Sequence, residues 1–267
     1  MREFLKDYIE AIKELPIKNK YSKEELLIND FLIQKEGKVE IYYAPHNEYI
    51  NPKAKVFIVG ITPGFQQMNA AIVEARKGIE KGLSIDEISY NCKVAARFSG
   101  SLRNNIISML DGIYLNDALG INSCSELFKN KDYLLHTISL IPYSVFIDGK
   151  NYTGHTPKIL KTSILMNYID SIFLDELSNL ENVLIIPLGK AVEEVLDKFI
   201  KEGRIDEDYV LKGFPHPSGA NGNRKKQYED NKEKMIKHIK EIFEYCNNIQ
   251  SEEYYVKMGM AWLLSIC

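Results

Sequence analysis

The apolar residues of this chain gather in short runs, and each run ends at a turn rich in glycine or proline. Three runs, at residues 55–60, 136–143 and 183–188, are apolar for most of their length, and Val210-Leu211 forms a shorter fourth run. Strands that are apolar along their whole length, with helices between them, are typical of a parallel sheet covered on both faces. We therefore predict an α/β fold.

Helices are predicted where apolar residues recur at three- and four-residue spacing. They are expected at residues 4–15, 23–34, 69–81, 84–92, 105–114, 160–177, 190–202 and 225–245, and a short alternating strand is expected at residues 39–43. Because no linker divides the chain, we predict one α/β domain over residues 1–250, in which residues 1–35 form N-terminal helices. A short apolar helix is expected at 251–267, and self-association of the protein through this helix is a possible consequence.

Composition narrows the class of protein without choosing a function. The formal net charge is −3, with 45% hydrophobic and 27% charged residues, as in an ordinary globular protein. The four cysteines are scattered and no histidine stands at metal-ligand spacing, so we expect free thiols and no metal. The N-terminus has acidic residues where a signal peptide is basic, and no window reaches the roughly 18 apolar residues of a membrane span. A cytoplasmic protein is expected.

Two of the turns carry the candidate chemistry. Residues 60–64 read Gly-Ile-Thr-Pro-Gly directly after a strand, and residues 216–221 read His-Pro-Ser-Gly-Ala-Asn after the run at Val210-Leu211. In parallel sheets, ligands bind beyond the carboxyl ends of the strands, where both turns are expected. We therefore predict that the first loop (60–64) and the second loop (213–221) face each other across one cleft.

These two loops resemble the two active-site motifs of the uracil-DNA glycosylase superfamily, in sequence, order and separation. Residues 183–191 are also similar to the strand-to-helix step that precedes the second motif, and the resemblance covers roughly residues 35–245. It implies a three-layer α/β/α sandwich with a four-stranded parallel sheet, no metal or organic cofactor, and DNA as a partner whose modified base is extruded into the cleft.

The resemblance also assigns roles to residues. His216 is placed as the hydrogen-bond donor to the oxygen that becomes negatively charged when the base departs. Such donors are the main means of stabilising the transition state of this reaction. The superfamily's water-handling Asp or Asn falls at Thr62, which is no base at neutral pH, although its hydroxyl can position a water; Gln66 and Gln67 are nearby amides. Phe65 is positioned to stack on the base. The other expected substrate contacts are Gly60, Ile61, Pro63, Gly64, Ser139, Tyr143, Asn151, Tyr152, Ser218 and Asn221.

Phosphate contacts are expected near the second loop. The candidates there are Ser218, Arg224 and Lys225. The opposite side of a basic groove would be formed by a cluster of Lys93, Arg97 and Arg103. His155 is expected to be exposed to solvent. Neither cluster is specific by itself, because charged clusters usually form solvated faces.

The sequence leaves three functions open. The first is a DNA glycosylase-like enzyme that excises uracil or another deaminated or damaged base in base-excision repair. The second is a weak or inactive binding module for nucleic acid or nucleotides, which Thr62 favours. The third is a hydrolase of free modified nucleosides or nucleotides, which the weakly acidic chain suits slightly better than duplex DNA.

Overall fold

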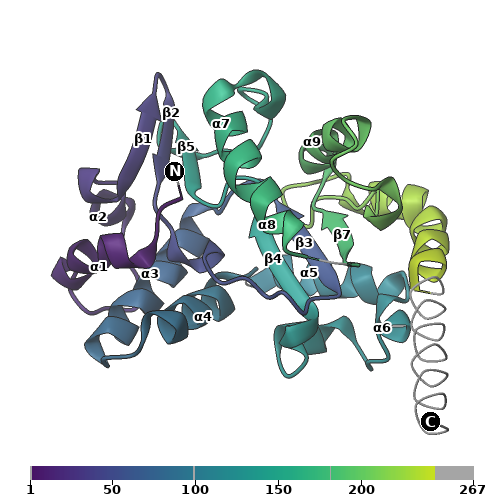
Figure 1. Ribbon diagram of the computed structural model, residues 1–267, viewed down its shortest axis with the longest axis horizontal. Helices are drawn as coiled ribbons and strands as arrows, with labels where there is room; N and C mark the ends of the chain where they lie inside the picture. The colour runs from purple at the N-terminus through teal and green to yellow at the C-terminus, as the bar shows by residue number, and fades with distance from the viewer. Residues whose placement is uncertain (1, 99, 181, 244–267) are drawn as a thin grey trace, which may run out of the picture.

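The computed structural model describes residues 2–98, 100–180 and 182–243 of the chain. Within these residues the protein is α/β, as the apolar runs predict, with one parallel and one antiparallel sheet. Figure 1 shows the parallel sheet near the centre of the molecule and the antiparallel sheet beside it, close to the N-terminal helices. The helix predicted at 251–267, with the self-association expected of it, lies outside the described residues.

The parallel sheet forms from the three longest apolar runs. Strand β3 (Val56–Gly60) is central, with β4 (Leu135–Ser139) on one side and β7 (Leu184–Pro187) on the other. In this register Phe57 lies opposite His136 of β4. Since the chain passes from β3 to one neighbour and then crosses to the other, the sheet has its topological switch point between β3 and β7.

The predicted four-stranded parallel sheet has three strands in the part of the chain that is described. Val210 forms a single parallel bridge with Ile185 of β7 instead of a ladder. The segment is short because a 3₁₀ turn, Glu207–Tyr209, comes directly before it and Gly213, with φ of 84°, turns the chain directly after it. The bridge still directs the second loop to the same sheet edge as the first.

The antiparallel sheet corrects one of the predicted helices. Its strands, in sheet order, are β1 (Leu32–Glu36), β2 (Val39–Tyr42), β5 (Ser144–Ile147) and β6 (Lys150–Asn151). The helix expected over 23–34 ends early, because α2 covers only Lys23–Leu26. The following residues pair with β2 across a turn at Gly37, whose φ is 57°. Strand pairing prevails here over a helical spacing of apolar residues.

A second hairpin joins β5 to β6. Asp148 and Gly149 both have positive φ, 49° and 69°, and they join β5 to β6 in the manner of a type I′ turn. The Asp-Gly pair is the sequence signal for this hairpin. Its consequence is that Asn151, at the end of β6, stands over the first loop.

Helices cover both faces of the parallel sheet. Alternate residues of β3 point to opposite faces, so that Phe57 and Val59 belong to one apolar cluster and Val56 and Ile58 to the other. The α-helices are α1 (Leu5–Glu14), α2, α3 (Phe65–Glu80), α4 (Ile85–Ala96), α5 (Gly100–Gly112), α6 (Leu115–Ala118), α7 (Ser163–Tyr168), α8 (Leu174–Ser178), α9 (Lys190–Lys201) and a helix over residues 224–243. None of the described helices is both long and apolar enough to cross a membrane.

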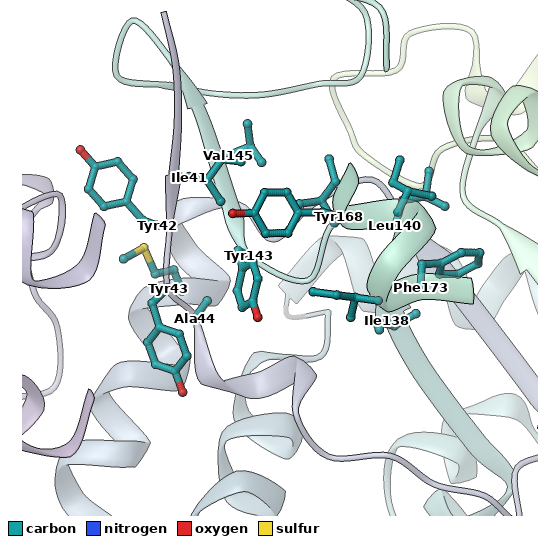
Figure 2. Close-up of a cluster of buried hydrophobic side chains, with 14 of the residues drawn as sticks. Ile41, Tyr42, Tyr43, Ala44, Ile138, Leu140, Tyr143, Val145, Tyr168 and Phe173 are labelled. Atoms are coloured by element: carbon teal, nitrogen blue, oxygen red, sulfur yellow. The ribbon is translucent and has the colours of Figure 1, made fainter. Parts of the chain in front are cut away.

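One apolar cluster joins the two sheets into a single core. Figure 2 shows Tyr143 and Tyr168 among the side chains of β2, β4 and α7, and their rings meet edge to face with centroids 5.7 Å apart. The Tyr143 hydroxyl accepts a 2.5 Å hydrogen bond from the backbone N–H of Glu3. The N-terminal segment is therefore tied to the same core.

Candidate active site

A large cavity lies beyond the carboxyl ends of the parallel strands. Its volume is about 870 Å³, and its lining includes Gly60 after β3, Ser139 at the end of β4, Gly189 after β7 and His216 of the second loop. The two loops therefore share one cavity, as the sequence predicts. This is the switch-point position at which open α/β sheets bind ligands.

The second loop is held rigidly from outside. Asn105 of α5 donates a 2.8 Å hydrogen bond to the carbonyl oxygen of Pro217, and the Arg224 guanidinium donates to the carbonyl oxygens of Pro217 (3.2 Å) and Ser218 (2.9 Å). The Asn221 amide donates to the carbonyl oxygen of His216 at 3.2 Å. These contacts fix the backbone on which the His216 ring is mounted.

The hydrogen bonding of His216 selects one tautomer. Its Nδ1 accepts a 3.2 Å hydrogen bond from the backbone N–H of Ser218, so Nδ1 carries no proton and the neutral ring carries its proton on Nε2. Burial lowers the pKa of His216, and the nearby His155 lowers it further. A neutral imidazole that donates through Nε2–H suits an oxygen on which negative charge develops.

Close backbone approach at Gly189 places the second loop against β7. A Cβ atom on this residue would stand 2.8 Å from the Cβ of His216, and the φ of 88° is one that other residues rarely adopt. Gly60 of the first loop is under less constraint, because a Cβ there would stand 3.5 Å from the hydroxyl oxygen of Ser139, an ordinary contact distance. Glycine at residue 189 is therefore what allows the second loop to lie against the end of β7.

Thr62 lines the cavity, but its hydroxyl is bonded to the backbone. It donates to the carbonyl oxygen of Tyr143 at 2.5 Å and accepts from the N–H of Val145 at 3.1 Å. Both bonds brace the connection between β4 and β5. The Thr62 hydroxyl therefore stabilises the wall of the cavity, and its proton is not available to a water molecule in the site.

We expect Thr62→Ala to affect stability more than chemistry. Loss of the hydroxyl leaves one backbone donor and one acceptor without a partner, which costs about 1–3 kcal/mol. Thr62→Ser keeps the hydroxyl and should restore most of that loss. Urea denaturation of the two variants measures the difference, and equal stability of Thr62→Ala and wild type would contradict this role.

The other predicted substrate contacts divide into two groups. Among the described residues, Phe65, Pro63 and Tyr143 do not line the cavity: the Phe65 ring lies by the Lys23 ammonium, 5.8 Å from its centroid, and Pro63 and Tyr143 are buried. The structure does not bring these three residues into the cavity lining, because a sequence does not say which way a side chain points at a loop or strand end. The residues that do line the cavity are Gly60, Ile61, Thr62, Gly64, Ser139, Asn151, Tyr152, Ser218 and Asn221.

Asn151 has a specific structural task beside the first loop. Its Oδ1 accepts a 3.0 Å hydrogen bond from the backbone N–H of Phe65, the first residue of α3. At the same helix end, the Gln67 side chain accepts from the N–H of Gly64 at 3.2 Å and donates to the carbonyl oxygen of Ala96 at 3.2 Å. Both amides are therefore engaged in holding the start of α3.

The cluster of Lys93, Arg97 and Arg103 does not form one side of a solvated basic groove. Lys93 is 3% exposed, and its ammonium donates to the carbonyl oxygen of Thr137 on the outer edge of β4. The Arg103 guanidinium donates to the carbonyl oxygens of Phe98 and Arg97. Arg97 lines the cavity but pairs with Asp132 at 3.2 Å.

Lys93 should give the protein a distinctive pH dependence. Burial lowers the pKa of its ammonium from 10.5 to about 7. Between those values the unfolded chain holds a proton that the folded protein lacks, so stability rises with pH and is lost as the pH falls toward 7. Relative to Lys93→Met, the unfolding free energy of wild type should rise by about 1.4 kcal/mol per pH unit. Urea titrations across this window test it, and parallel curves for the two proteins would contradict it.

Three titratable residues that line the cavity were not assigned to a site from the sequence. His46 is buried in the 3₁₀ turn Pro45–Asn47, and burial lowers its pKa to about 3. His155 is exposed, as predicted, yet it also lines the cavity, as does Lys190 at the start of α9. His46 follows a proline, as His216 does, and this shared pattern is the sequence signal that could have marked His46 as a site residue.

The charge of the cavity differs from that of the whole chain. Its described lining contains Arg97, Lys190 and three histidines but neither Asp nor Glu, although the chain has a net charge of −3. The Nδ1 of His46 and the Nε of Arg97 are buried without a hydrogen-bond partner. Such an environment favours an anionic ligand or one rich in acceptor atoms.

Fold and cavity together define an α/β protein with a large cavity at the carboxyl edge of its parallel sheet. The chain is 43% identical to "Uncharacterized protein YoxB" of Bacillus subtilis (strain 168) over 240 aligned residues. These aligned residues make up 90% of this chain and 93% of YoxB. The chain therefore belongs to the same family as YoxB. No protein-family model and no solved structure matches it.

Proposed function

We propose that the protein is a DNA glycosylase-like hydrolase that cleaves the N-glycosidic bond of a deaminated or damaged base, such as uracil. The observation that carries this proposal is His216, which lines the cavity shared with the first loop and whose neutral ring carries its proton on Nε2. Breaking the bond leaves negative charge on a carbonyl oxygen of the base. A fixed, neutral donor stabilises that charge in the transition state.

The proposed fold is that of the uracil-DNA glycosylase superfamily. Three features support it: the two loop motifs, their position at one sheet edge, and the parallel bridge of Val210 beside β7, which stands where a fourth strand would pair. The cavity of about 870 Å³ exceeds the size of one base and leaves room for the attached sugar.

The test is an excision assay on modified DNA. The protein would be incubated with oligonucleotides that contain uracil, hypoxanthine or xanthine, as single and double strands, and the abasic product would be measured after alkaline cleavage. Product from one of these bases, but not from the matching unmodified DNA, is expected. Absence of product from all of them at high enzyme concentration would reject the proposal.

A second candidate, hydrolysis of a free modified nucleoside or nucleotide, is favoured by one observation. The basic residues expected to grip DNA are largely engaged inside the protein, since Lys93 is buried and Arg103 and Arg224 donate to backbone carbonyls. Lys225 remains exposed. Release of free base from a deaminated nucleotide, with none from the same base in DNA, would select this candidate. Salt-dependent DNA binding without turnover would instead select the inactive binding module.

A further inference from the structure

A group that accepts a proton from the attacking water accelerates hydrolysis of an N-glycosidic bond, and the cavity offers few such groups. Its described lining has no carboxylate. The Thr62 hydroxyl is bonded to backbone, and the oxygens of Asn151 and Gln67 accept hydrogen bonds from the start of α3. An amide is in any case not a base at neutral pH. The choice is therefore among the three histidines.

Two of these histidines are unsuited to take a proton. The pKa of His46 is lowered to about 3 by burial, so its ring accepts a proton only in strong acid. His216 uses Nδ1 to accept from the N–H of Ser218 and carries its proton on Nε2, so its remaining ring nitrogen is a hydrogen-bond donor and not a base. His155 has an exposed ring that makes no hydrogen bond to any described residue.

The loop that carries His155 packs against the first loop and the start of α9. A Cβ on the preceding residue, Gly154, would stand 2.9 Å from the side chains of both Ile61 and Ala191. Ile61 belongs to the first loop, and Ala191 lies two residues after Gly189, which contacts His216. The turn between β7 and α9 thus lies between the loop of His155 and the loop of His216, and both rings line the same cavity.

We propose that His155 is the general base that activates the attacking water, in the role that Thr62 cannot fill. This inference rests on the proposed N-glycosidic hydrolysis. It makes the site a pair of histidines with opposite tasks, since one ring accepts a proton from water while the other donates a hydrogen bond to the departing base.

The water oxygen forms a bond to the anomeric carbon, and a water proton passes to a ring nitrogen of His155. The carbon–nitrogen bond breaks, and its electron pair leaves with the base, whose carbonyl oxygen accepts a hydrogen bond from Nε2–H of His216. His155 then returns its proton through solvent to a nitrogen of the base. The products are the neutral base and a sugar with a hydroxyl group.

The test compares chemistry with binding in His155→Ala. Its single-turnover rate of base release should fall roughly 100-fold or more, as general bases contribute. Its affinity for an uncleavable, 2′-fluorinated analogue of the substrate oligonucleotide should stay near that of wild type. Added imidazole should restore the rate with increasing concentration. Lys158→Ala, an exposed change in the same segment, is the matched control and should keep the wild-type rate.

The outcomes separate the two proposals. A wild-type protein that releases no base from any substrate rejects the proposed hydrolysis, and the role of His155 falls with it. An active wild type together with a fully active His155→Ala rejects only the role of His155. A slow His155→Ala variant that imidazole does not restore, or one whose binding falls in parallel with its rate, also overturns the general-base assignment.

Discussion

Replacing His216 with alanine should slow base release roughly 100- to 1,000-fold, as loss of one oxyanion donor does in other enzymes. The donor is lost at the transition state, so the loss should appear in the rate of the bond-breaking step. Single-turnover measurements on the substrate identified in the excision assay give this rate directly. The effect should greatly exceed that of Thr62→Ala, whose hydroxyl contacts only backbone.

A donor-preserving change provides the control for this prediction. The His216→Asn variant keeps a hydrogen-bond donor, the N–H of the side-chain amide, at residue 216. It should recover part of the rate that His216→Ala loses. Both variants should unfold near the wild-type temperature, because the ring itself makes one hydrogen bond, to Ser218. Similar small losses in His216→Ala and Thr62→Ala would show that His216 is not the donor.

Glu176→Ala should cause the largest loss of stability, about 3–5 kcal/mol. This carboxylate is fully buried on α8, where it lies 2.6 Å from Nε2 of His136 and 3.2 Å from the Arg2 guanidinium. Truncation leaves the buried imidazole and the cation without their common partner. Urea denaturation measures the loss in unfolding free energy. The dependence of this free energy on urea concentration should be the same in the variant and the wild type.

The neighbouring residue offers a matched control. Asp175→Ala removes an exposed carboxylate from the same helix, and we expect a change within about 0.5 kcal/mol. Glu176→Gln keeps the hydrogen bond to His136 but loses the charge opposite Arg2, so its stability should lie between those of Glu176→Ala and wild type. If Glu176→Ala were no less stable than Asp175→Ala, the buried pair would not hold α8 to the sheet.

The sequence predicted the central strands and the two loops because their signals are local. The apolar runs before the loops at residues 60–64 and 213–221 specify buried strands, and the glycines and prolines specify tight turns. The helix predicted over 23–34 runs into the strand at 32–36, whose conformation depends on pairing with β2 rather than on its own apolar spacing. The predicted fourth parallel strand is reduced to one bridge, because turns on both sides of Val210 shorten it.

Side-chain direction was the part of the site that the sequence could not supply. Ser139 ends β4 and Tyr143 lies four residues later, directly before β5, yet Ser139 lines the cavity and Tyr143 enters the core. Lys93 and Arg97 form a cluster in the sequence, but the helix turns them into the protein. Exposure of His155 was predicted correctly, and it did not reveal that an exposed ring can still border a cavity.

The outer edge of β4 has a consequence for how this protein behaves at high concentration. An uncovered strand edge presents backbone groups to which a strand of another molecule can add, and this is a common route to aggregation. Here side chains occupy that edge, since Lys93 donates to the carbonyl oxygen of Thr137 and Asn51 donates to that of Leu135 at 3.0 Å. Removing those side chains would reopen a template for strand addition, so the two residues protect the protein against its own copies.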